Sequence, residues 1–176
     1  MNSLTEFKKI PILPLLIAVT LVVGAVPARA TPVCGVTTET LAVGHYPSGL
    51  LNLMCNEFDQ YGWDLKLKVK GNSDVYVTRH TFPVGAHTGW HTHPGPSLIT
   101  VIAGALTVYE ADDPTCTPHV YQTGESFTDI GCGDVHLVRN EGTEPAMDVA
   151  VQIVPAGAPR RIEADQPANC PVITCP

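Results

Sequence analysis

Three histidines in this 176-residue chain have the spacing that a metal site requires. His91 and His93 are separated by one residue, and His136 follows 43 positions after His93. Side chains alternate between the two faces of a β-strand, so His91 and His93 would point the same way from one strand. A third ring can come from a neighbouring strand, and imidazole nitrogen binds several divalent transition metals. We therefore predict a metal site made of His91, His93 and His136.

His87 is a further candidate for this site. It precedes His91 by four residues and would share its face on an uninterrupted strand. Gly85 and Gly89 flank it, however, and loops break the alternation. It is an additional ligand or, as we prefer, a solvated histidine in a loop at the mouth of the site.

The segments around these histidines have the pattern of short β-strands. Alternating or continuous apolar runs separated by turn residues predict strands at 63–69, 75–82, 91–93, 98–103, 105–110, 126–130, 135–139 and 147–154. No segment after residue 31 has a convincing helical period. Many short strands with regular turns predict an all-β sandwich or barrel.

The first thirty residues have the pattern of a cleaved signal peptide. Two lysines precede an apolar run at 10–26, and Ala28-Arg29-Ala30 is a cleavage signature. A retained membrane anchor is the alternative, but the run is short for a bilayer span and contains Pro11 and Pro14. We expect an exported protein with one domain at 31–176 and no membrane segment after cleavage. The tail after residue 155 is expected to be irregular.

Charge and cysteine content narrow the possible partners and compartments. The first thirty residues hold three of the ten basic and one of the seventeen acidic residues, so 31–176 has a formal charge of −9. Such an acidic chain repels phosphate backbones, and we expect no nucleic-acid partner. An even number of cysteines in an exported chain favours disulfides. Six allow fifteen pairings, among which we single out Cys116–Cys170; the candidates are Cys34, Cys55, Cys116, Cys132, Cys170 and Cys175.

The histidines lie within a motif that resembles the first conserved motif of the cupin family. Gly85, His91, His93 and Gly104 match its spacing, with Ser97 where the family normally has glutamate. A second stretch resembles the end of the family's second motif, with matches at Gly133, His136 and Asn140, and Gly124 matches the start of that motif. This stretch has one extra residue before Gly131, and Gly131 stands where the family usually has proline. The resemblance covers about residues 75–154.

The resemblance implies a six- to eight-stranded antiparallel jelly-roll barrel. It also implies that His91, His93 and His136 bind a divalent transition metal, which could be Fe, Zn, Mn, Ni or Cu. Ser97 is a poor ligand, but it could hydrogen-bond a water on the ion or a substrate oxygen. Three neutral imidazoles would leave the ion's double charge in place and keep coordination positions open.

The activity implied by the resemblance is an oxygenase-type or isomerase-type reaction on a small organic substrate. The alternative is a non-catalytic cupin that binds a metal or a small ligand, or one that has lost its metal and holds an apolar or sugar ligand. A homodimer formed through edge strands is also expected, because pairing hides those edges.

Overall fold

A computed structural model describes residues 30–55 and 62–175 of the chain, and the predicted signal peptide lies almost wholly outside them. The regular elements of the described part are β-strands. They are β1 (Thr37–Tyr46), β2 (Leu53–Cys55), β3 (Leu65–Leu67), β4 (Ser73–Phe82), β5 (His91–Thr92), β6 (Ser97–Ala103), β7 (Ala105–Glu110), β8 (His119–Gln122), β9 (Ser126–Asp129), β10 (His136–Arg139), β11 (Ala146–Pro155) and β12 (Ile162–Glu163). Within those two ranges, no helix has the length and apolar character needed to cross a bilayer.

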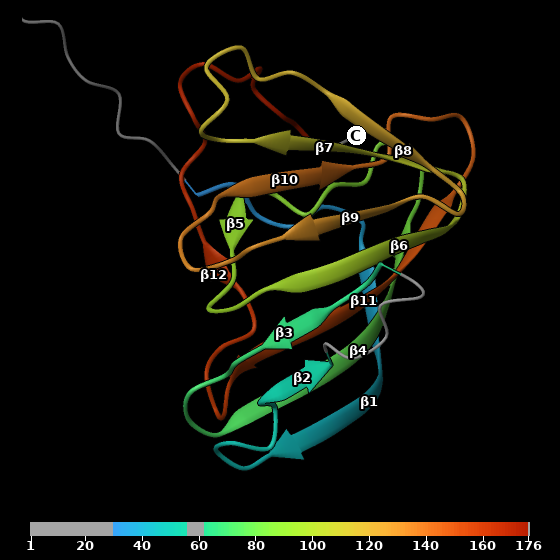
Figure 1. The fold of residues 1–176 in the computed structure, drawn as a ribbon. Coiled ribbons are helices and arrows are strands. Elements are labelled where there is room, and N and C mark those ends of the chain that lie inside the picture. The colour runs from blue at the N-terminus through green and yellow to red at the C-terminus, as the bar shows by residue number, and fades with distance from the viewer. Residues whose placement is uncertain (1–29, 56–61, 176) are drawn as a thin grey trace, which may run out of the picture.

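The strands form two five-stranded antiparallel sheets. The orders are β1-β4-β11-β6-β9 and β12-β5-β10-β7-β8, and β2 pairs with β3 in a separate ribbon. In Figure 1 strands β1, β4 and β11 of the first sheet lie in the lower part of the molecule, and strands β7, β8 and β10 of the second sheet lie in the upper part. Neighbouring strands are mostly not consecutive in the chain, as in a jelly roll. The predicted all-β antiparallel jelly-roll fold is confirmed.

The central strand β11 shows how the interior is built. Residues at alternate positions are buried, and the apolar side chains between them are only half-buried. The buried set includes the polar residues Asp148 and Gln152, which line a cavity between the sheets. The strand was predicted. Its apolar residues at 147, 149, 151 and 153 lie on the outer face of the sheet, whereas the inner face carries the polar groups that line the cavity.

Two groups of buried side chains form the core. The larger lies between the two sheets and includes Phe82, Val101 and Leu106. The smaller surrounds Trp90, which is 1% exposed and lies with Leu137 among the residues of the second cluster. Burial of such large side chains supplies most of the driving force for folding. The fold therefore holds the cavity in a rigid, close-packed frame.

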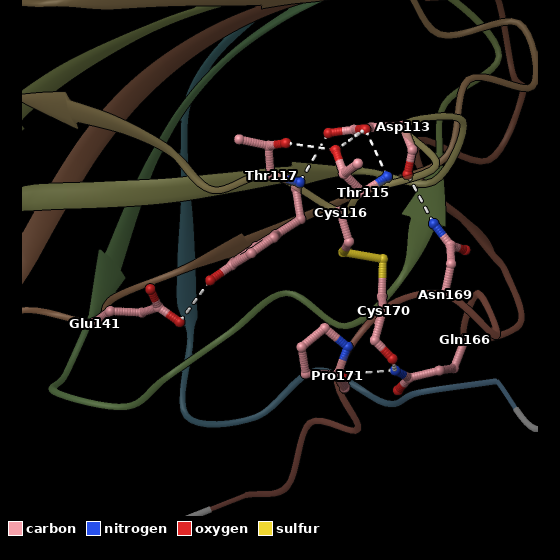
Figure 2. The surroundings of a disulfide bond; sticks show 10 residues. Asp113, Thr115, Cys116, Thr117, Glu141, Gln166, Asn169, Cys170 and Pro171 are labelled. Atoms are coloured by element: carbon pink, nitrogen blue, oxygen red, sulfur yellow. Dashed lines mark hydrogen bonds between the residues drawn. A yellow bond between two sulfur atoms is a disulfide. The ribbon is translucent and has the colours of Figure 1, made fainter.

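Two disulfides join the C-terminal tail to the body of the domain. Cys116 bonds Cys170, as predicted, and Cys34 bonds Cys175. Figure 2 shows that the first of these bonds lies beside a hydrogen bond from the Asn169 side-chain amide to the Asp113 carbonyl, 2.7 Å long. Of the six candidate cysteines, all of them in the described ranges, Cys55 and Cys132 are free.

Several predicted elements need correction. The expected half-buried strand at 63–69 is only β3, which pairs with β2 alone, and Trp63 is 58% exposed. With no further sheet neighbour, its alternating pattern is not buried against a core. Strands β1, β2, β8 and β12 were not predicted. The tail is not wholly irregular, because β12 pairs with β5 and so adds an edge strand next to His91.

Candidate metal centre

Strand register brings the three predicted histidines together. His91 begins β5 and lies directly opposite His136, the first residue of β10. His93 follows β5 and precedes the Pro94-Gly95-Pro96 stretch, which interrupts the strand. One ring nitrogen from each histidine lies within 4.8 Å of the others. The side chains thus form one compact group, as the spacing predicted.

Backbone carbonyls orient two of the rings. The Nδ1 atom of His91 is 2.9 Å from the Gly89 carbonyl, and that of His93 is 2.5 Å from the Arg160 carbonyl. A carbonyl oxygen can only accept a hydrogen bond, so Nδ1 of His91 carries the proton and its Nε2 lone pair is free, as outer contacts commonly arrange in metal-binding histidines. His93 Nδ1 lies between the Arg160 carbonyl and the Gln152 side-chain nitrogen, which is 2.7 Å away.

Burial keeps the rings neutral at physiological pH. It lowers the pKa of His136 to about 3, an effect to which the nearby His93 adds. It also lowers the pKa of His91 far below its ordinary range, and that of His93 despite the opposing Arg160 carbonyl and Asp129 carboxylate. Only a neutral imidazole offers a lone pair to a cation.

Unpaired buried polar atoms surround the same point. Ser97 Oγ, Asp129 Oδ2 and His136 Nδ1 are buried and have no hydrogen-bond partner among the described residues. All three residues line the cavity that contains His91 and His93. Buried polar groups without partners are costly, and a bound cation is one way to satisfy them. The donor set fits a divalent transition metal.

The cavity next to the histidines has a volume of about 340 Å³, within the usual range for small-molecule sites. Its walls combine apolar side chains such as Phe82, Ile99 and Phe127 with the basic residues Arg160 and Arg161. The guanidinium of Arg160 lies 4.6 Å from the centre of the Tyr76 ring. The site is therefore a cavity in which apolar side chains lie beside histidine, carboxylate and guanidinium groups.

His87 lies away from this group. It is 2% exposed, its backbone bonds that of Cys34 in both directions, and its Nδ1 accepts a hydrogen bond from the Gly89 amide at 3.1 Å. Burial lowers the pKa of His87. The preferred interpretation as a solvated loop histidine is wrong, because the N-terminal segment covers it. Ser97, by contrast, faces the cavity as expected of a site residue.

Three residues of the site were not found from the sequence. They are Asp129, Gln152 and Arg160. Asp129 and Gln152 each occupy the buried face of a predicted strand, where a polar residue is an available signal of function. Arg160 belongs to the tail, and its role in orienting His93 through a backbone carbonyl carries no sequence signal.

The chain is similar to known proteins over part of its length. Residues 78–152 match the family described as "Cupin domain". No curated protein matches the chain. A conserved double-stranded β-helix protein from Klebsiella pneumoniae is 24% identical, with a TM-score of 0.44 over 52% of this chain and 76% of that one. A cupin 2 conserved barrel protein from Leptotrichia buccalis is 17% identical, with a TM-score of 0.43 over 67% of this chain and 40% of that one. A predicted oxalate decarboxylase from Thermotoga maritima is 18% identical, with a TM-score of 0.39 over 48% of this chain and 83% of that one.

Proposed function

We propose that this protein, whose residues 78–152 match the cupin-domain family, binds one divalent transition-metal ion through His91, His93 and His136. The observation that supports the proposal is the convergence of three imidazoles on one point, two of them buried and that of His93 half-buried. Iron, zinc, manganese, nickel and copper are all compatible with a site of this kind.

The chain's own residues define what such a site does. The bound ion would supply Lewis acidity or, if redox-active, electron transfer to a small molecule beside it. Phe82, Ile99 and Phe127 would exclude water and hold the carbon skeleton of an organic ligand. The Ser97 hydroxyl would donate a hydrogen bond to an oxygen of that ligand, since it has no partner among the described side chains.

Elemental analysis of purified protein tests the metal site. We expect about one transition-metal ion per chain in the wild type and a large loss of it in His91→Ala and in His136→Ala. His119→Ala is the matched control, because His119 is exposed on β8 and lies outside the three-histidine group. Metal content unchanged in the two site variants would refute the assignment.

We propose an oxygenase-type reaction on a small organic substrate as the activity, because three histidine ligands leave coordination positions open. The alternative is a non-catalytic module that only binds a small ligand, which the largely apolar cavity walls also suit. Oxygen uptake by the iron-loaded protein across a panel of small organic molecules distinguishes the two. Absence of uptake with every redox metal would favour the binding module.

We also propose that the chain is exported and that residues 1–30 are removed as a signal peptide. Two disulfides support the export part of this proposal, because they form and persist in oxidising compartments. Intact-mass measurement of protein purified from the secreting cell should give a chain that begins at Thr31 and contains two disulfides. A full-length reduced chain would contradict the proposal.

A further inference from the structure

We propose that Asp129 supplies the metal with the carboxylate ligand that position 97 lacks in this chain. The inference rests on the metal site proposed above and adds a fourth protein ligand to it, so the open positions that the proposed reaction needs exist only on an ion that takes more than four ligands. The carboxylate would come from β9, the neighbouring strand of β6, instead of from β6 itself.

Strand register places the two positions side by side. Ser97 on β6 lies directly opposite Asp129 on β9, and the next inward pair is Ile99 opposite Phe127. All four residues are buried, so both pairs face the interior. Directly opposed residues in an antiparallel pair have Cβ atoms roughly 5 Å apart. The Asp129 carboxylate can therefore reach the space that a longer acidic side chain at position 97 would occupy.

The distances around Asp129 favour a shared ion over direct hydrogen bonds. Its Oδ2 atom lies 3.5 Å from His93 Nε2, and its Oδ1 atom lies 3.7 Å from His136 Nδ1. Hydrogen bonds between such groups are about 2.7–3.2 Å long. Two ligands bonded at about 2.1 Å to one tetrahedral ion lie roughly 3.4 Å apart. The observed separations are closer to the second geometry.

The orientation of His93 leads to the same conclusion. Its Nδ1 atom contacts the Arg160 carbonyl and the Gln152 side-chain nitrogen, and its Nε2 atom faces Asp129 Oδ2. That oxygen is buried and has no hydrogen-bond partner among the described residues. A positive charge between Asp129 Oδ2 and His93 Nε2 would stabilise both atoms in this buried site. A divalent ion bound by both residues would supply that charge.

A second contact holds the carboxylate in this orientation. The Gly131 amide donates a hydrogen bond of 2.7 Å to Asp129 Oδ1. That bond leaves Oδ2 directed towards His93. One carboxylate would cancel one unit of the ion's charge, which three imidazoles alone would leave uncompensated.

The test compares zinc affinity, measured by competition with a chromogenic chelator, in the full-length chain and in its variants. We expect Asp129→Asn to weaken zinc binding roughly tenfold or more and to change the visible spectrum of the cobalt-loaded protein. Ser97→Glu combined with Asp129→Asn should recover most of the affinity, because the carboxylate then comes from position 97. Asp148→Asn is the matched control, since Asp148 is equally buried in the cavity but bonds His80.

The outcomes separate this inference from the proposed function. If Asp129→Asn binds zinc within twofold of the wild type and has the same cobalt spectrum, the Asp129 assignment fails. If His91→Ala also binds as the wild type does, the metal site itself fails. Should Asp129→Asn not fold, a crystal structure of the zinc-loaded wild type decides the question. We expect an Asp129 oxygen about 2.0–2.2 Å from the zinc, and a longer distance with only water in that position would overturn the proposal.

Discussion

At the scale of single residues, the interior holds acidic and basic groups that no apolar barrel would need. The side chains of His93, His136 and Asp129 are 15%, 6% and 5% exposed, and His91 is also buried. Burial raises the pKa of Asp129 and lowers those of His91 and His136. Burial therefore shifts each of these groups towards its neutral form. A cation would reverse that preference for the carboxylate, which is how metal binding and protonation become linked.

Glu110 gives a pH dependence that can be measured without metal. Glu110 lies on the same face of β7 as the buried residues Leu106 and Val108, and it is paired with His136 on β10. Burial, with Asp134 and Asp112 nearby, raises the pKa of Glu110 to about 7, above its ordinary value of 4.5. The native state then binds more protons than the unfolded state between these values, so stability falls as the pH rises through this range.

Glu110→Gln should therefore stabilise the metal-free protein at pH 8 by roughly 1 kcal/mol after solvent screening, and have little effect below pH 4.5. Urea unfolding in the presence of a chelator measures both values. Glu144→Gln, at an exposed position, is the control. A stabilisation of equal size at both pH values would contradict the account.

The metal-site histidines could be predicted from the sequence, whereas most of their partners could not. His91 and His93 alternate within one motif, so their common face follows from strand geometry. The proximity of Asp129 depends on the pairing of β6 with β9, which is a contact across 32 positions of the chain. Local patterns contain no information on which strand pairs with which.

At the scale of elements, the turn after β9 determines where Asp129 points. Gly131 has φ of +64°, and a Cβ atom there would lie 2.3 Å from the Gly95 carbonyl oxygen. The turn therefore packs against the Pro94-Gly95-Pro96 stretch that follows His93, and glycine alone fits this position. The same residue donates the hydrogen bond to Asp129.

We predict that Gly131→Ala lowers the free energy of unfolding by about 3 kcal/mol or more, because backbone strain and a backbone clash add together. Gly124→Ala is the matched control: its φ is +91°, but a Cβ atom there would meet nothing within 4 Å. The control should lose only about 1 kcal/mol. Urea denaturation measures both, and equal losses would show that the contact with Gly95 is unimportant.

At the scale of the whole molecule, residues of both sheets line the cavity that contains the three histidines, and two disulfides tie the tail to the domain. The fold class was predictable because strand-length apolar runs and turn residues recur along the chain. The edge strands were harder: β1 is exposed along most of its length, and β12 has only two residues, so neither has a clear burial pattern. The exposed side chains of Leu98 and Ile102 lie on the outer face of the first sheet, and the homodimer stays a prediction.

The most direct test of the metal site is anomalous X-ray diffraction from crystals of the zinc- or cobalt-loaded protein. The account predicts one strong anomalous peak per chain, about 2.0–2.1 Å from a ring nitrogen of each of His91, His93 and His136. A peak located elsewhere, or none at the three histidines in fully loaded crystals, would contradict it.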